Sequence, residues 1–440
     1  MKKTISLILC IIISLTACTA AFAGSSSGKS FYIDSVSGND EADGSTPETA
    51  WKTVSRLNGE TFSAGDNILF KRGCTFNGTF SANGNGTESE PITVSAYGEG
   101  ANPVFSSEDP IPLFMVIGVS NWVFENLELT APQGIGMMIY GMNGNNAENI
   151  TVRNCYFHDI SPDGEGTNYC AVYLNMDRSG ARLHNIHLDS LRIENTSWAI
   201  HCGGVNAEND KDIFRSPDED YSSDYVFENI YIKNAKRAGI VVAAVKNCLV
   251  RNCRILDCAT AQESAFAPLW IRHSKFVTVE YCEIAGSTNK TDGMAIDFDG
   301  WTTDSVYRYI YSHDNTRFIK NCVFDNVTYN AGNEVCNCVS VNDNEKMNWS
   351  AISLISSSAP SFAAMRNFSF HDNIIVNGSP ILWIRTPLAK IENVTFIGSA
   401  FSNLLHRFFN LFSFSTGFNY RADGDISELI EVITKDLPEY

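Results

Sequence analysis

Two aspartates in the second half of the chain, Asp297 and Asp299, have the type and spacing needed for acid and base chemistry. Within Gly293–Trp301 they alternate with apolar residues such as Ile296 and Phe298, and a period of two is that of a β-strand. If the apolar side chains point into a core, both carboxylates face the other way, with Cα atoms about 6.5–7 Å apart. Two carboxylates arranged in this way could act as the general acid and the general base of a hydrolytic reaction.

Neighbouring segments with the same alternation should add further side chains to this outward face. Stacked strands lie about 4.8 Å apart, so outward residues at equivalent positions form a row. The row that the alternation predicts contains Tyr173, Asn175, His201, Trp270, Arg272, Asp297, Asp299 and Lys320. Aromatic faces can stack on sugar rings. The residues that we expect to bind a sugar are Tyr173, Asn175, His201, Trp270 and Trp301. The alternative is an ordinary solvated strand face, in which Arg272 and Asp297 form a surface ion pair.

A recurring phrase indicates which elements carry this row. In each copy, alternating apolar residues lead to an Asn or a substitute for it, and further apolar residues or Cys follow. The clearest copies are Trp122–Leu129, Ile150–Phe157, Tyr225–Ile232, Cys248–Ile255 and Val277–Ile284. The centres of all copies, weaker ones included, are Asn126, Asn154, Ser190, Asn229, Asn252, Tyr281, Tyr309, Asn337, Asp372 and Asn393. Successive centres are 21 to 39 residues apart, a recurrence that is typical of stacked structural units.

The phrase indicates a strand, a tight corner and a second strand. Asn suits the corner because it tolerates a left-handed backbone and because its amide can hydrogen-bond to the backbone of a neighbouring coil. Most copies leave no room for a crossover helix. We therefore predict an all-β fold, a right-handed parallel β-helix of about ten coils, in which each coil buries its inner face by stacking on its neighbours.

The cysteines fit the interior of such a solenoid. Eleven of the thirteen follow residue 23, and Cys155, Cys253, Cys282 and Cys338 each occupy the position after a corner. Other copies have Leu or Ile at that position. We expect these cysteines to fill an apolar ladder as small hydrophobic residues and to remain unpaired.

The first residues have the features of an export signal. A pair of lysines precedes an apolar run over Ile5–Leu15, and Ala21–Ala23 is a small-x-small cleavage site. We expect residues 1–23 to be a signal peptide and the protein to be secreted. Because Leu15–Cys18 resembles a bacterial lipobox, a lipid anchor at Cys18 is the alternative.

The charge of the chain restricts its partners. The formal net charge is −18, and it becomes −20 once the two lysines of the signal are removed. A chain this acidic is poorly suited to nucleic acid, which is itself anionic. Apart from the signal, no segment approaches the length of an apolar membrane span. We expect a monomer whose partner is a polysaccharide.

The segment from residue 28 to about 105 differs from the repeats. It contains a strand at Phe31–Asp34, an acidic loop at Ser37–Gly44, a short helix over Thr46–Leu57 that begins with a Thr cap and a Pro, and a turn and strand over Ala64–Gly73. These segments closely resemble the start of exported bacterial pectin-lyase-like β-helix proteins. The resemblance extends over roughly residues 30–400. It implies the fold, whereas the group includes glycoside hydrolases, polysaccharide lyases and proteins without an assigned activity.

The chain divides into a signal peptide and three further parts. Residues 24–105 form the N-terminal cap and first coils, residues 106–400 the β-helix, and residues 401–440 a C-terminal cap with a short helix over Ile426–Leu437. An open stack of coils needs such caps so that it does not expose a strand edge.

Three functions are compatible with this sequence. The first is a secreted glycoside hydrolase, with Asp297 and Asp299 as acid and base. The second is a polysaccharide lyase, in which these aspartates hold Ca²⁺ against a uronate while Lys320 or Arg272 abstracts the C5 proton. The third is a non-catalytic glycan-binding or surface protein. A further Ca²⁺ hypothesis concerns Asp40 and Asp43 of the acidic loop, for which a solvated turn is the alternative.

Overall fold

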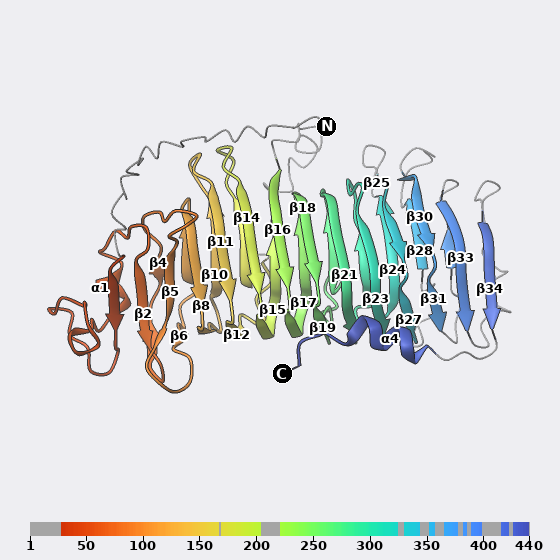
Figure 1. Cartoon of the computed structure of the whole chain (residues 1–440). Coiled ribbons are helices and arrows are strands. Elements are labelled where there is room, and N and C mark those ends of the chain that lie inside the picture. Colours follow the sequence, from red (N-terminus) through yellow and green to blue (C-terminus); the bar gives the residue numbers. More distant parts are fainter. Residues whose placement is uncertain are drawn as a thin grey trace, which may run out of the picture.

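The computed structural model describes residues 28–439 except 167–168, 204–220, 324–329, 344–351, 357–364, 377–381, 385–388, 398–414 and 422–425. The chain is a right-handed parallel β-helix, as predicted, and its coils follow one another along a single axis (Figure 1). Residues 1–23, with the expected signal peptide and Cys18, lie outside the described residues, as does most of the predicted apolar cap before residue 415.

Three stacks of parallel strands form the walls of the solenoid. The first stack consists of β1 (Ser30–Ile33), β2 (Asn67–Lys71), β5 (Ile92–Tyr97), β8 (Ser120–Glu125), β11 (Ala147–Arg153), β14 (Leu183–Asp189), β16 (Ser222–Glu228), β18 (Val245–Arg251), β21 (Lys275–Ala285), β23 (Val306–His313), β26 (Glu334–Cys336), β30 (Phe368–His371), β33 (Ala389–Ile397) and β34 (Ser415–Arg421).

The second stack consists of β3 (Thr75–Asn77), β6 (Val104–Ser106), β9 (Glu128–Thr130), β12 (Tyr156–Ile160), β15 (Arg192–Cys202), β17 (Tyr231–Ala243), β19 (Arg254–Leu256), β27 (Val339–Val341) and β31 (Ile374–Val376), together with the second halves of β21, β23 and β33. The third stack consists of β4 (Phe80–Ser81), β7 (Pro112–Ile117), β10 (Ile135–Gly141), β13 (Cys170–Met176), the ends of β15 and β17, β20 (Leu269–Arg272), β22 (Met294–Phe298), β24 (Arg317–Val323), β28 (Ile352–Ser356) and β32 (Leu382–Ile384). A separate pair joins β25 (Asn330–Ala331) to β29 (Met365–Arg366).

The inward side chains of the three stacks form one continuous apolar core. In β22, Ile296 and Phe298 belong to it, and the ring of Phe298 lies 4.6 Å from that of Tyr307 on the next coil. The predicted ladder of cysteines is confirmed, because four free thiols belong to this core, namely Cys155, Cys253, Cys282 and Cys338.

The corners have the backbone conformation that the repeat predicted. Nine of the ten predicted centres have positive φ, between 52° and 59°, and the tenth lies in β33. The Asn side chains differ from the prediction, because they bond mainly to side chains on the neighbouring coil rather than to its backbone. Asn252 Nδ2 donates to Asn229 Oδ1 (3.3 Å), and Asn229 Nδ2 donates to Asp189 Oδ1 (2.8 Å).

The N-terminal cap differs from the predicted single helix. Thr46 caps a short 3₁₀ helix, η1 (Pro47–Thr49), and a separate turn of helix, α1 (Val54–Leu57), follows. Trp51 separates the two because it forms a parallel bridge with Ile33 and buries its ring. The strand predicted within Ala64–Gly73 is β2.

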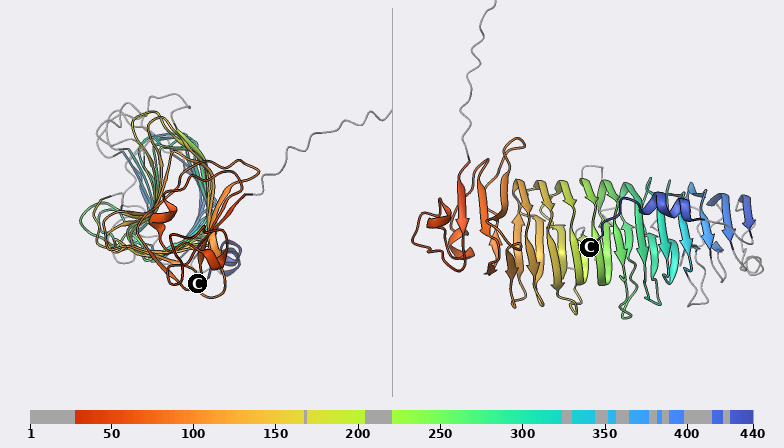
Figure 2. Two further views of the ribbon diagram at one scale, coloured as in Figure 1. Left: turned by 90° about the vertical axis from the view of Figure 1, so that its left-hand side faces the viewer. Right: turned by 60° about the horizontal axis from the view of Figure 1, so that its bottom comes forward.

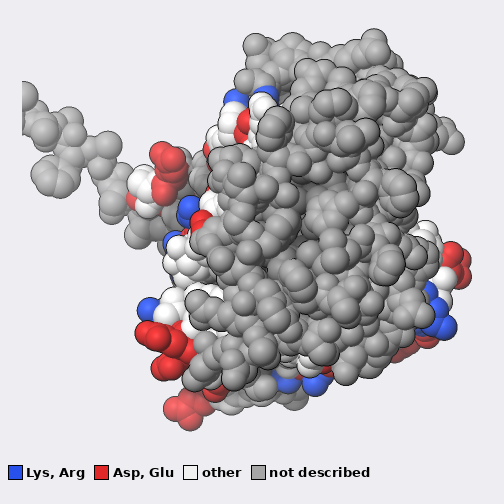
Figure 3. Space-filling view, turned by 90° about the vertical axis from the view of Figure 1, so that its right-hand side faces the viewer, with Lys and Arg blue, Asp and Glu red and all other residues white. Residues whose placement is uncertain are grey.

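At the other end, the predicted helix is present as α4 (Ser427–Thr434). It runs back along the outside of the solenoid and packs against β21 and β23, as two views show (Figures 1 and 2). Among the described residues, no helix has the length and apolar character of a membrane span. Both acidic and basic side chains are visible at the rim of the C-terminal end (Figure 3).

The corners provide a test of the fold. We predict that Asn252→Val lowers the free energy of unfolding by about 1–3 kcal/mol, because a β-branched residue is strained at a φ of 53°. Asn252→Gly keeps the backbone conformation and removes only the side-chain hydrogen bonds, so it should cost less, about 1 kcal/mol. Denaturant unfolding measures both values. A valine variant as stable as the glycine variant would contradict a left-handed corner.

Candidate functional site

Two parallel rows of side chains run along the outer face of the third stack. Register pairs Tyr173 with His201, His201 with Val241, Val241 with Trp270, Trp270 with Asp297, and Asp297 with Lys320. We call these six residues row one. Row two lies two residues further along each strand and consists of Asn175, Gly203, Ala243, Arg272, Asp299 and Cys322.

The two rows bring together the eight side chains that the sequence predicted, but not the exposure predicted for the aspartates. Asp297 points away from the core, because its strand neighbours Ile296 and Phe298 point into it. We expected the two carboxyl groups to be open to solvent or to a groove, and neither is open to solvent, since Asp297 is 3% exposed and Asp299 is 5% exposed. Register places Asp297 beside Trp270, whereas Arg272 stands in row two.

Burial dominates the electrostatics of the two aspartates. Removal from water raises the pKa of Asp297 well above its ordinary value, and the nearby Asp299 carboxyl raises it further. Burial also raises the pKa of Asp299, to about 7, against the opposing effect of Arg272 and Lys320. Because the groups interact, they titrate as a pair, and the pair retains a proton near neutral pH. We call Asp297 and Asp299 the dyad.

A third carboxylate, Asp292, belongs to the same site. Its Oδ1 lies 2.8 Å from Nζ of Lys320, and its charge raises the pKa of both members of the dyad. Burial alone would lower the pKa of Lys320, but Asp297 and Asp292 are among the groups that outweigh it, so the pKa of Lys320 is raised. Lys320 is therefore a charged ammonium group that compensates Asp292.

The sequence did not single out Asp292 because it precedes β22 and lies outside the strand alternation that revealed the dyad. Cys322 was missed for a different reason. Its type suggested a core residue, yet it occupies the outward position two residues after Lys320. The strand register was the signal that could have placed Cys322, whereas only the loop conformation places Asp292.

Aromatic side chains form the other end of row one. The rings of Tyr173 and His201 are stacked with centroids 6.0 Å apart, and Trp198 meets His201 edge-on at 5.1 Å. Burial lowers the pKa of His201 to about 4, so the imidazole is neutral at pH 7. Trp198 also belongs to a second apolar cluster, outside the main core, against which Tyr173 and Trp270 pack.

Several polar atoms on this face are buried without a hydrogen-bond partner. They include Nδ1 of His201, Nε1 of Trp198, Nε1 of Trp270 and Oδ1 of Asp297. A buried polar atom left unbonded costs about 1–3 kcal/mol, and such atoms usually have a functional or solvent explanation. Three of these four atoms belong to row one, so this face holds several polar groups whose hydrogen bonds the described residues do not supply.

The remaining predicted residues have more local positions. Asn175 in row two hydrogen-bonds to the hydroxyl of Tyr173 and accepts from the Met176 amide at 2.8 Å. Trp301 lies outside both rows, in the turn after β22, where its backbone is left-handed and its side chain is nearly buried.

The residues that could ligate a metal ion lie away from rows one and two. Among the described residues, two groups could hold a metal ion, namely Glu334 with Cys336 and His371, and His187 with Asp189 and Glu228. Neither includes the dyad, to which the sequence assigned a possible Ca²⁺.

In the N-terminal loop, Asp40 accepts hydrogen bonds from the amides of Lys52 and Thr53 (2.7 and 3.0 Å), an arrangement that favours a turn over a Ca²⁺ site.

Comparison with known proteins agrees with the fold. No protein-family model matches the chain. In sequence it is similar to lacto-N-biosidase of Bifidobacterium longum subsp. longum, with 24% identity in an alignment of 232 residues that covers 43% of this chain and 14% of that protein. The chain thus spans about a seventh of the length of that relative.

Two solved structures are similar in three dimensions. The GH136 lacto-N-biosidase from Eubacterium ramulus has a TM-score of 0.65 and 19% identity, over 82% of this chain and 68% of that one. XylC in complex with xylose has a TM-score of 0.60 and 9% identity, over 90% of this chain and 87% of that one. At these identities, the likeness shows a common fold.

The burial of the dyad leads to a prediction about stability. Folding raises the pKa values of Asp297 and Asp299 above the value of about 3.9 that an aspartate has in an unfolded chain. The folded chain therefore retains protons that the unfolded chain releases. As a result, the free energy of unfolding falls as pH rises from about 4 through the folded pKa values. Asp297→Asn and Asp299→Asn should therefore become more stable relative to the wild type as pH rises from 5 to 8.

Thermal unfolding at several pH values measures this difference, and Asp163→Asn is the control. Asp163 is exposed and ion-paired with Lys236, an interaction that lowers its pKa, so its variant should gain nothing as pH rises. A dyad variant that loses stability relative to the wild type between pH 5 and 8 would show that the dyad is ionised at little cost.

Proposed function

We propose that this protein is a glycoside hydrolase that binds an uncharged saccharide along rows one and two and cleaves it beside Asp292, Asp297 and Asp299. The observation that carries the proposal is the arrangement of the three carboxyl groups. Glycoside hydrolysis requires one carboxyl group that donates a proton and one that is ionised. The dyad and the Asp292–Lys320 pair provide these two states side by side.

The dyad would be the proton donor. A general acid works best when its pKa lies near the operating pH, and the pKa of Asp299 is raised to about 7. Asp297, whose pKa burial also raises well above its ordinary value, would stay protonated beside it. In the proposed mechanism, Asp299 protonates the glycosidic oxygen as the bond to the anomeric carbon breaks.

Asp292 would be the ionised partner. Its Oδ1 lies 2.8 Å from the Lys320 ammonium group, and a carboxylate at this position can either deprotonate a water molecule or attack the anomeric carbon directly. This assignment modifies the one drawn from the sequence, in which Asp297 and Asp299 were acid and base. The reason is that two adjacent buried carboxyl groups do not readily ionise together.

The aromatic end of row one favours an uncharged sugar. Tyr173, Trp270 and the neutral His201 present apolar faces together with polar atoms that lack partners, a combination suited to stacking and to hydrogen bonds with hydroxyl groups. A uronate would require an uncommitted cation, whereas Lys320 already pairs with Asp292.

The similarity to the two lacto-N-biosidases supports hydrolysis, and it makes a lacto-N-biose glycoside a reasonable first substrate. The lyase alternative has less support. Its base would be Lys320 or Arg272, but the pKa of Lys320 is raised rather than lowered, and a guanidinium group does not lose its proton in proteins. We also propose that the protein is secreted, on the basis of residues 1–23.

A saccharide panel tests the proposal. Neutral oligosaccharides, polysaccharides, polyuronates and an aryl lacto-N-bioside would be incubated with the protein, and two products would be measured. New reducing ends without ultraviolet-absorbing unsaturated ends would support hydrolysis. Unsaturated ends from a polyuronate would overturn it in favour of a lyase, and no cleavage of any substrate would favour a binding protein.

We predict that Asp292→Asn and Asp299→Asn each lower kcat by about 10²–10⁴, the usual contribution of a general acid or base. Azide should partly restore Asp292→Asn, because it replaces an ionised carboxylate, and should not restore Asp299→Asn. Asp163→Asn, in the exposed ion pair, should keep wild-type kcat. If both active-site variants retained wild-type kcat on a substrate that the wild type cleaves, the site would be elsewhere.

A further inference from the structure

Three corners repeat one arrangement of a His with two carboxylates, two of them on the second stack, at His158 and His313, and one on the first stack, at His371. The His residues are His158, His313 and His371, each followed by an Asp that lies 2.7 Å from its Nδ1. On the preceding coil, a Glu lies 3.1 to 3.2 Å from each Nε2, and these residues are Glu128, Glu283 and Glu334. The repetition indicates that the arrangement is in the first place a structural link between coils.

The third corner differs from the other two in the residue that faces the His. Register places Thr130 beside His158 and Ala285 beside His313, whereas Cys336 stands beside His371. The other two imidazoles are also covered by a stacked tyrosine ring, from Tyr156 and Tyr311. The position equivalent to these tyrosines, two residues before His371, is Ser369, which has no ring. Of these three corners, only this one combines a thiol with a His that has no tyrosine two residues before it.

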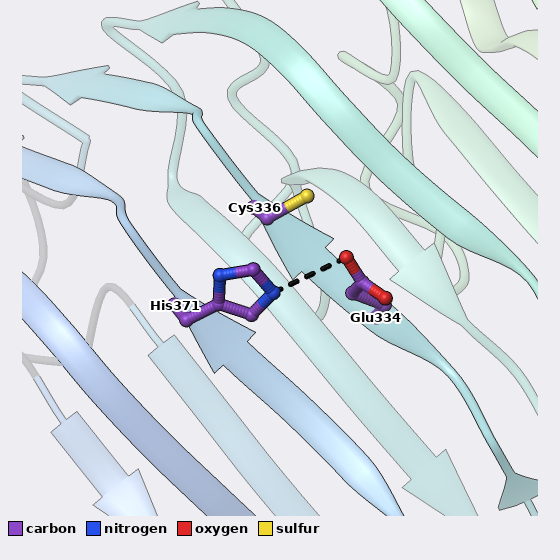
Figure 4. A group of neighbouring side chains, drawn as sticks. All are labelled: Glu334, Cys336 and His371. Carbon is purple, nitrogen blue, oxygen red and sulfur yellow. Dashed lines mark hydrogen bonds and ion pairs between the residues drawn. The ribbon is translucent and has the colours of Figure 1, made fainter. Parts of the chain in front are cut away.

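The three side chains at this corner converge (Figure 4). The potential ligand atoms of Glu334, Cys336 and His371 all lie within 4.8 Å of one another. Around a tetrahedral Zn²⁺, with bonds of about 2.0–2.3 Å, ligand atoms are separated by about 3.3–3.8 Å, so small side-chain movements would complete the geometry. Cys336 is buried, whereas the side chains of Glu334 and His371 are 43% and 27% exposed, which leaves a route for an ion and a position for water.

We propose that Glu334, Cys336 and His371 form a binding site for Zn²⁺ or a similar divalent transition-metal ion. A carboxylate and a thiolate carry two negative charges, which balance the ion, and imidazole, thiolate and carboxylate are the ligand types that Zn²⁺ prefers. Asp372 fits a second role, since its bond to Nδ1 of His371 directs Nε2 toward the ion, as outer carboxylates do in known zinc sites.

Proton release accompanies binding in this proposal. The ion replaces the proton on Sγ of Cys336 and the proton that Nε2 of His371 shares with Glu334, and no oxidation or reduction takes place. Arg308 stands beside Cys336 on the preceding coil, but it is already bonded to Glu280 at 2.6 Å. The site lies on the first stack and does not depend on the proposed hydrolase activity.

The experiment uses the full chain, freed of metal, with Zn²⁺ and Co²⁺ as probes. Calorimetry should show one equivalent of Zn²⁺ bound, with affinity increasing with pH, and Co²⁺ should give the absorption bands of thiolate coordination. Cys336→Ala should abolish these bands and weaken Zn²⁺ binding at least about 10-fold, and Asp372→Asn should weaken it by about 10–100-fold.

His313→Gln is the matched control, because it removes the equivalent imidazole from a corner that lacks a thiol. It should leave both the stoichiometry and the cobalt spectrum unchanged. Circular dichroism of each metal-free variant establishes that it is folded. The proposal is overturned if the wild type binds no stoichiometric Zn²⁺, or if the folded Cys336→Ala variant binds Zn²⁺ as tightly as the wild type.

Discussion

In-register stacking of one coil on the next is the constraint on which the rest of this structure depends. Hydrogen bonds between parallel strands hold each strand about 4.8 Å from the equivalent strand of the next coil. Residues at equivalent positions of adjacent coils therefore lie side by side. Apolar residues repeated at one position become the core, and Asn residues repeated at another become a line of left-handed corners linked by their side chains. An outward position repeated over several coils becomes a row, and rows one and two are examples.

The same constraint explains how a charged site can exist on a β-helix. Stacking places Asp297 between Trp270 on one coil and Lys320 on the next. Enclosure then raises the pKa values of the dyad, while Lys320 compensates Asp292. Carboxyl groups in different environments, a buried dyad and an ion-paired aspartate, therefore lie close together. This difference in environment, rather than the presence of aspartates as such, supports a hydrolytic role.

The sequence predicted those features that depend on periodicity. The corner residues, the inward cysteines and the composition of the outward rows all follow from the position that a residue occupies in a repeat. Stacking converts this position directly into a place in the structure.

The burial of Asp297 could not be predicted in this way, because it depends on what surrounds the outer face and not on strand alternation. Asp292 was missed because it lies in a loop, and the single predicted helix over Thr46–Leu57 failed because the bridge between Trp51 and Ile33 overrode local propensity. The corner at Cys336 required knowledge of which residues face one another across coils.

The central claim is that a carboxyl group of the dyad remains protonated near neutral pH, close to the ion pair of Asp292 and Lys320. Carbon-13 NMR of protein labelled at aspartate carboxyl carbons, followed from pH 3 to 9, measures this most directly, with the Asp292→Asn, Asp297→Asn and Asp299→Asn variants used to assign the signals. The account predicts that two of these signals titrate far above the ordinary aspartate value of about 3.9 and that each alters when the other residue is replaced. Titration of all three carboxyl groups near their ordinary value would contradict it.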